Sequence, residues 1–148
     1  MFSKILVAVD GSAKSNKALK IALEDIAGEG TEIHVVHVLS KHLYQAIESE
    51  VGYDGVESPY EIRQNLLDKE REKVVGFLNK ACEGKNIGYE LHVLKGDPRH
   101  VILDTAEEIG VDLIVVGSYG KGLGERLILG SVSNHVISHS KISTLVIK

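Results

Sequence analysis

Five short stretches rich in apolar residues lie along this chain, at residues 4–10, 31–39, 89–93, 113–116 and 144–147. The first and fourth are nearly unbroken, whereas a half-buried strand shows apolar and polar residues in alternation. A continuous run is typical of a strand covered on both faces, as in a parallel sheet. Parallel neighbours need crossover connections, which are usually helical and right-handed. The pattern therefore predicts an α/β fold, an open parallel sheet with helices on both faces.

Four helices are expected between these strands, at residues 12–27, 58–83, 98–109 and 131–139. The second has the most complete start signal, because Ser58 can cap the helix, proline follows, and Glu61 stands at the capping-box position. The third expected helix has a similar start, because Asp97 can cap it and Pro98 follows. Residues 40–57 show weak periodicity and are expected to form a loop with a short helical piece.

The length of 148 residues fits one domain spanning residues 1–148, with 43% hydrophobic residues to supply a core. No apolar run approaches the roughly 20 residues of a membrane-spanning helix, which argues against an integral membrane protein. The first residues lack the long apolar stretch of a secretory signal. The single cysteine, Cys82, cannot form an internal disulfide. We therefore expect a cytoplasmic protein.

The charge balance argues against nucleic-acid binding, since 17 basic residues face 21 acidic residues and the net charge is −4. The distribution is uneven. Residues 117–148 contain four basic residues and one acidic residue. A small anionic ligand is therefore favoured near this C-terminal stretch.

A glycine-rich loop after the fourth expected strand is the strongest functional signal, because five of the 15 glycines fall within residues 117–130. Glycine lets backbone N–H groups approach a phosphate closely. Residues 130–133, Gly-Ser-Val-Ser, then begin a helix whose free N–H groups and dipole favour an anion. The alternative is a loop whose glycines serve turn geometry alone. If the first and fourth strands are neighbours, this loop shares a crevice with Asp10 and Gly11.

Several common motifs are absent from the chain. A P-loop requires Gly-x4-Gly-Lys-Ser/Thr, and no such string occurs. The turn after the first strand does not supply the Gly-x-Gly-x-x-Gly of dinucleotide-binding folds. No Gly-x-Ser-x-Gly marks a hydrolase nucleophile.

The glycine loop nevertheless has a recognisable spacing. It contains Gly-x2-Gly-x9-Gly-Ser, at Gly117, Gly120, Gly130 and Ser131. Three further blocks accompany it, at residues 5–12, 96–98 and 112–118. On these residues the chain resembles the ATP-binding universal stress proteins, and the resemblance covers nearly its whole length.

The resemblance implies a doubly wound sheet of strand order 3-2-1-4-5, with ATP held between the first and fourth strands. It implies that Ala8, Val9 and Asp10 face the ribose or adenine, and that Val38 meets the adenine through its backbone. The residues implied to line the ribose and phosphates are Gly117, Tyr119, Gly120, Gly130, Ser131 and Val132, with Ser133 as an adjacent hydroxyl. Read without the resemblance, Asp10 is equally suited to cap the first helix.

The same resemblance implies a cytoplasmic regulatory protein that responds to nucleotide occupancy. Any hydrolysis is expected to be slow and to need Mg²⁺, because Asp10 is the one acidic residue that the sequence places near the crevice. A homodimer is expected through antiparallel pairing of the last strand, residues 144–147, whose apolar edge invites pairing.

The histidines and the cysteine give weaker signals. His34 and His37 are three residues apart on an expected strand, so they face opposite sides and cannot chelate one ion together. His135 and His139 are four apart on an expected helix, where two ligands can converge, although ordinary surface histidines are the simpler interpretation. Cys82 fits a small buried hydrophobe better than a nucleophile.

Two other functions remain open on the sequence. One is an enzyme that uses the same crevice for adenylyl or phosphoryl transfer, although no clear base or nucleophile accompanies Asp10. The other is a chaperone-like dimer that needs no nucleotide, against which the glycine-rich loop argues. The protein partner and the preference among ATP, ADP and AMP do not follow from the sequence.

Overall fold

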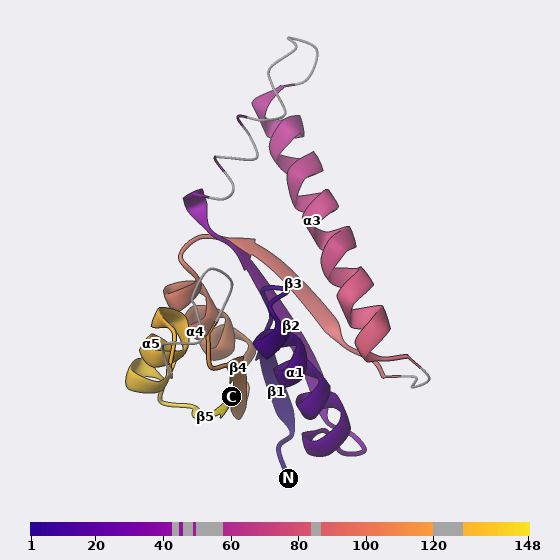
Figure 1. Ribbon diagram of the computed structural model, residues 1–148, viewed down its shortest axis with the longest axis vertical. Helices are drawn as coiled ribbons and strands as arrows, with labels where there is room; N and C mark the ends of the chain where they lie inside the picture. The colour runs from indigo at the N-terminus through magenta and orange to yellow at the C-terminus, as the bar shows by residue number, and fades with distance from the viewer. Residues whose placement is uncertain (43–44, 46–48, 50–57, 84–86, 120–128) are drawn as a thin grey trace.

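A computed structural model of the chain contains a five-stranded parallel sheet (Figure 1). It describes residues 1–42, 45, 49, 58–83, 87–119 and 129–148. The strands are β1 (Lys4–Ala8), β2 (Glu32–Leu39), β3 (Glu90–Lys95), β4 (Leu113–Gly117) and β5 (Ser143–Ile147). Their order across the sheet is β3-β2-β1-β4-β5 and every pairing is parallel, which confirms the expected fold and strand order.

Helices cover both faces of this sheet. They are α1 (Ala13–Ile21) with a π-helical turn η1 (Ala22–Ile26), α3 (Pro59–Ala81), α4 (Pro98–Ile109) and α5 (Ser131–His139). Figure 1 shows α1 and α3 on one side of the sheet and α4 and α5 on the other. Ile5 and Val7 belong to the apolar cluster on the first side, and Leu6 to the cluster on the second. All three are 0% exposed, as expected for a strand covered on both faces.

The position of β1 at the centre of the sheet creates a switch in strand order. Ile5 pairs with Ile33 of β2 on one side and with Leu113 of β4 on the other. From β1 the chain therefore builds the sheet first towards β3 and later towards β5. The carboxyl ends of β1 and β4 lie side by side, where open α/β sheets bind their ligands.

The helix starts expected from the sequence are present. The Ser58 hydroxyl accepts a hydrogen bond from the Glu61 backbone N–H at 3.2 Å, and the Glu61 carboxylate accepts one from the Ser58 N–H at 3.0 Å. Asp97 caps α4 by accepting from the Arg99 N–H at 3.0 Å. Gly110 ends α4 at a φ of 76°, a left-handed conformation that favours glycine.

The first two elements end earlier than expected. β1 stops at Ala8, because the Asp10 N–H donates to the Ser15 hydroxyl at 3.2 Å and Gly11 turns the chain with a φ of 80°. The helix expected over 12–27 is α-helical only to Ile21 and then widens into η1. There the Ala27 N–H donates to the Ala22 carbonyl at 2.8 Å, five residues back.

The longest described helix, α3, has 23 residues and carries charged residues along most of its length. Its C-terminal half packs Val74 and Leu78 against the sheet. Its N-terminal half packs Ile62 and Leu66 beside Leu39. None of the helices in the described ranges is both long and apolar enough to cross a membrane. The loop expected over residues 40–57 lies almost entirely outside the described residues.

A carboxylate joins the amino ends of the two central strands. Asp112 precedes β4, and its two oxygens accept hydrogen bonds from the backbone N–H groups of Ser3 and Lys4, both at 2.9 Å. The Asp112 N–H in turn donates to the Lys4 carbonyl at 2.9 Å. The hydrogen bond from Ser3, reinforced by that from Lys4, holds the pKa of Asp112 below its ordinary value of 3.8.

We expect Asp112 to make stability depend on acidity. Because its pKa is lowered by folding, the carboxylate stabilises the fold above pH 3.8, and this contribution is lost as the pH falls through the lower folded value. Asp112→Asn should therefore reduce the free energy of unfolding at neutral pH, and the difference from wild type should shrink in acid. Urea unfolding at several pH values measures both. A difference independent of pH would contradict this role.

Candidate functional site

A cleft of about 510 Å³ opens at the carboxyl ends of β1, β2 and β4. Its volume lies within the range of about 300–1,000 Å³ that is usual for small-molecule sites. Ten of the eleven residues predicted for the nucleotide site line it: Ala8, Val9, Asp10, Val38, Gly117, Tyr119, Gly130, Ser131, Val132 and Ser133. The eleventh, Gly120, lies outside the described residues. The structure thus brings together segments that are more than 100 positions apart in the sequence.

On the β1 side, the chain leaves the sheet through a tight turn. Asp10 Oδ1 accepts a hydrogen bond from the Ser12 N–H at 2.9 Å, and Gly11 supplies the positive φ that the turn requires. The cap of α1 is Ser12, whose hydroxyl accepts from the Ser15 N–H at 3.2 Å. Asp10 therefore supports the turn before the cap, and the alternative that Asp10 itself caps the helix is wrong.

On the β4 side, backbone carbonyls are held by nearby donors. The Ser118 carbonyl accepts from the Gly130 N–H at 2.6 Å and from the Ser133 hydroxyl at 2.7 Å. The Ser133 side chain is 2% exposed, so its hydroxyl ties the end of β4 to the start of α5. What Ser133 can still offer a ligand is its backbone N–H in the first turn of α5.

The start of α5 differs from those of the other described α-helices. Ser12, Ser58 and Asp97 each cap their helix with a side chain, whereas Gly130 at the start of α5 makes no such hydrogen bond. The first turn of any helix has N–H groups without intrahelical acceptors. At α5 these groups adjoin the cleft, and together with the helix dipole they favour an anion.

Gly117 has a packing role that the sequence did not reveal. A Cβ placed there would lie 2.8 Å from the Lys14 carbonyl carbon and 2.9 Å from the Ser15 backbone nitrogen. The first turn of α1 therefore packs directly on the end of β4. This contact brings the Asp10 turn and the β4 loop to the same cleft.

His37 and Glu70 also line the cleft, although sequence reasoning did not place them there. His37 Nδ1 lies 2.8 Å from the Val9 carbonyl oxygen, and its Nε2 lies 3.1 Å from Glu70 Oε1. The pair therefore connects β2, β1 and α3 beside Val38. A histidine within an apolar strand was the available signal for His37, whereas Glu70 stands among many charged residues of a long helix.

Charges at the mouth of the cleft are largely paired. Beside Pro98, which lines the cleft, the Asp97 carboxylate is 2.7 Å from Arg99 Nη2. The hydrogen bond from the Arg99 guanidinium lowers the pKa of Asp97 to about 2. On the opposite side, Lys14 Nζ lies 5.5 Å from the centre of the Tyr119 ring. A lysine next to a lining residue adds positive charge where an anion would enter.

Comparison with known proteins agrees with the pattern of the glycine loop. Residues 1–148 match the model of the universal stress protein family. The universal stress protein YxiE of Bacillus subtilis is 35% identical over 150 residues, and the alignment covers 100% of both chains.

Solved structures extend this likeness to three dimensions. The structure of MJ0577 from Methanocaldococcus jannaschii superposes with a TM-score of 0.76 at 29% identity, covering 100% of this chain and 96% of the other. A universal stress protein family protein from Arabidopsis thaliana, solved with AMP bound, gives 0.64 at 26% identity, covering 99% and 91%.

The close approach at Gly117 predicts the effect of a small substitution. Gly117→Ala should lower the free energy of unfolding by about 1–3 kcal/mol, because the added methyl group meets backbone atoms that cannot rotate away. Gly88→Ala is the matched control, since a Cβ at Gly88 meets nothing within 4 Å. Chemical denaturation of both variants gives the comparison. Equal stability of Gly117→Ala and wild type would show that α1 does not pack this closely on β4.

Proposed function

We propose that this chain, which belongs to the universal stress protein family, binds an adenine nucleotide in the cleft between β1 and β4. ATP with Mg²⁺ is the ligand that we expect. The observation that carries the proposal is the uncapped start of α5 at one end of a cleft whose other end is the edge of β2. We further propose a regulatory role, in which the occupied and empty states present different surfaces to a partner.

The phosphates would bind at the start of α5. Backbone N–H groups of Ser131, Val132 and Ser133 are available in its first turn, and all three residues line the cleft. The neighbouring acceptors are already engaged, since the Ser118 carbonyl accepts from the Ser133 hydroxyl and the Gly130 carbonyl accepts from the Asn134 N–H. The polar groups left for a ligand here are thus donors, which suit phosphate oxygens.

The adenine would bind against the exposed edge of β2. β1 pairs with β2 as far as Ala8 and Val36, and the Val9 N–H donates to the Val36 carbonyl at 2.9 Å. Alternate residues of a parallel strand direct their backbone groups to the same side. Val38 therefore directs its N–H and carbonyl towards the side from which β1 has turned away. One donor and one acceptor at this spacing can pair with the amine and a ring nitrogen of adenine.

The ribose would lie between these two ends, near Asp10. Asp10 lines the cleft, and its Oδ1 accepts a hydrogen bond from the Ser12 N–H. A carboxylate is a suitable acceptor for ribose hydroxyls, as in other α/β nucleotide sites. Asp10 is also the carboxylate that we propose for Mg²⁺, because it lines the cleft at the turn after β1.

We expect hydrolysis, if the nucleotide is ATP, to be slow. Among the described lining residues, Asp10 and Glu70 are the acidic ones, and Glu70 already contacts His37 and Lys73. The AMP-bound Arabidopsis relative supports nucleotide binding rather than a transfer reaction. The single cysteine is consistent with the cytoplasmic location that we propose.

Gly130→Val tests the phosphate site. The residue has a φ of −77°, which valine also adopts, and it lines the cleft next to the first turn of α5, where we expect a β-branched side chain to obstruct the phosphates. Loss of two hydrogen bonds to a charged group, each worth about 1.5–3 kcal/mol, should weaken ATP binding at least roughly 100-fold. Calorimetric titration of ATP with Mg²⁺ into both proteins measures the change.

A matched control separates the site from general damage. Gly88→Val adds the same side chain in open space away from the cleft, and it should bind ATP as wild type does. Circular dichroism should show both variants folded. Tight ATP binding by folded Gly130→Val would place the phosphates elsewhere, and a wild-type chain that binds no adenine nucleotide would overturn the proposal.

We also propose a homodimer formed by β5. This strand pairs with β4 on one side and is at the edge of the sheet on the other. Light scattering at micromolar concentration should give the mass of two chains. In hydrogen exchange, the β5 amides on the side away from β4 should lose protection when the protein is diluted. Only the second chain of a dimer can protect the outer side of an edge strand. A one-chain mass with unchanged β5 exchange would contradict the dimer.

A further inference from the structure

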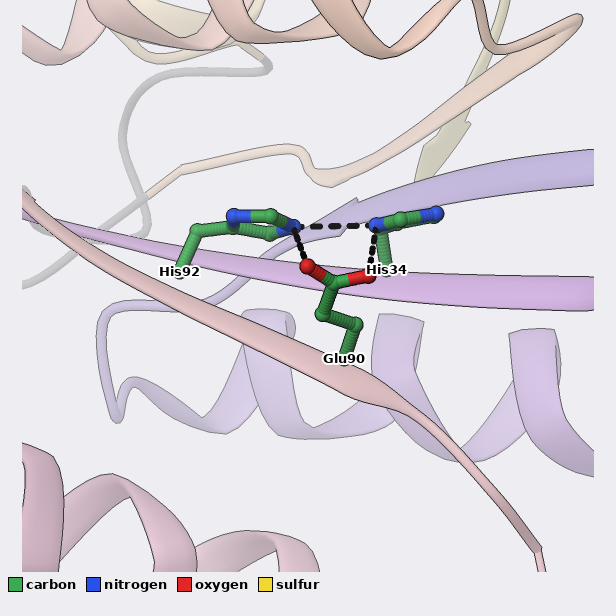
Figure 2. A group of neighbouring side chains, drawn as sticks. All are labelled: His34, Glu90 and His92. Atoms are coloured by element: carbon green, nitrogen blue, oxygen red, sulfur yellow. Dashed lines mark hydrogen bonds and ion pairs between the residues drawn. The ribbon is translucent and has the colours of Figure 1, made fainter.

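A second polar cluster lies where β2 and β3 pair near their amino ends. It consists of His34 from β2 with Glu90 and His92 from β3 (Figure 2). His34 stands opposite Glu90 in the register, and Glu90 and His92 are alternate residues of one strand. All three side chains therefore project from the same face of the sheet. Their ligand atoms lie within 4.8 Å of one another, and no other such group of three occurs among the described residues.

We propose that His34, Glu90 and His92 bind a divalent transition-metal ion such as Zn²⁺. The ligands would be His34 Nδ1, His92 Nε2 and one carboxylate oxygen of Glu90. Two imidazoles and one carboxylate form a known zinc donor set that leaves a fourth position for water. The Glu90 side chain is 67% exposed, so this position is open to solvent. Val38 is about 13 Å further along β2, which separates the metal site from the nucleotide cleft.

Glu32 strengthens the inference because it holds His34 in the required tautomer. Glu32 Oε1 lies 2.6 Å from His34 Nε2. An ionised carboxylate can only accept, so Nε2 carries a hydrogen, and in the neutral imidazole Nδ1 then keeps its lone pair. Metal-binding histidines commonly donate their other ring N–H to a carboxylate in this way. The side chain that is least exposed in the cluster, His34, is thus oriented with Nδ1 towards His92 and Glu90.

In this structure the two rings meet end to end. His34 Nδ1 lies 2.9 Å from His92 Nε2, the ring centres are 5.2 Å apart, and the planes differ by 21°. Because His34 carries its hydrogen on Nε2, His92 Nε2 donates to His34 Nδ1. Binding an ion replaces this hydrogen bond. The hydrogen of His92 moves to Nδ1, and both facing nitrogens then present lone pairs to the ion.

The rearrangement needed for an ion is small. Tetrahedral zinc, with Zn–N bonds of about 2.0–2.1 Å, separates two ligand nitrogens by about 3.3 Å, so the rings must part by about 0.4 Å and turn by roughly 35°. Rotation about χ2 of histidine has a broad minimum. Figure 2 shows the Glu90 carboxylate beside the line between the nitrogens, with its oxygens 3.7 Å from His34 Nδ1 and 4.0 Å from His92 Nε2. The Glu90 carboxylate is therefore close enough to both nitrogens to act as the third ligand.

The test is a Zn²⁺ titration in competition with a chromophoric chelator, on untagged protein first treated with a chelating resin. Wild type should bind one ion per chain at this site. His92→Gln and Glu90→Gln should each weaken binding at least tenfold. Glu32→Gln should weaken it by about 10–100-fold, the usual effect of losing an outer partner. Co²⁺ in place of Zn²⁺ should give the visible absorption of a tetrahedral site in wild type and lose it in His92→Gln.

The matched control is His139→Gln, because His135 and His139 on α5 form a separate histidine pair with ring centres 4.0 Å apart. This variant should retain the wild-type affinity. Glu90 is exposed, so Glu90→Gln should fold even if a histidine variant does not, and circular dichroism checks each protein. Binding that survives both Glu90→Gln and His92→Gln, binding that His139→Gln abolishes, or no binding at micromolar Zn²⁺ would each overturn the proposal.

Discussion

β1 pairs with β2 on one side and with β4 on the other, and its central residues Ile5, Leu6 and Val7 are fully buried. The cleft follows from the points at which these strands end. β1 leaves the sheet after Ala8, whereas β2 continues to Leu39. The departure of β1 exposes the edge of β2 near Val38. Because the turn after β1 leads directly into α1, the same departure places the Asp10 turn and the first turn of α1 beside the end of β4.

The hydrogen bonds around this cleft favour a ligand of one sign of charge. Several carbonyl groups around it are engaged: that of Val9 by His37, that of Ser118 by the Ser133 hydroxyl, and that of Gly130 by the Asn134 N–H. The start of α5, in contrast, has no side-chain cap. Backbone donors without intrahelical acceptors at a helix start favour an anion. The phosphate site that we propose therefore does not require a positive net charge, and the net charge of this chain is −4.

The sequence predicted the sheet because burial on both faces leaves a direct signature in the apolar runs. The family resemblance, which rests on the glycine spacing and the block around Asp10, implied ten residues that the structure places along the cleft. The sequence did not predict η1, since the apolar positions of an α-helix and of a wider turn differ little over five residues. His37 with Glu70, and His34 with His92, depend on which residues of separate elements come into register. That information belongs to the packing of the sheet and not to any local pattern.

Two histidines on one strand illustrate how such packing separates their roles. His34 and His37 face opposite sides of β2, and a buried imidazole is costly unless its nitrogens are paired. His37 lies between two acceptors, the Val9 carbonyl and the Glu70 carboxylate. Both ring nitrogens of His37 are therefore engaged, and the residue joins β2, the turn after β1 and α3. His34 Nε2 faces the Glu32 carboxylate and Nδ1 faces the ring nitrogen of His92, so a neutral imidazole donates to Glu32 while it directs a lone pair at His92. This difference in partners is the physical reason why we propose His34, and not His37, as a metal ligand.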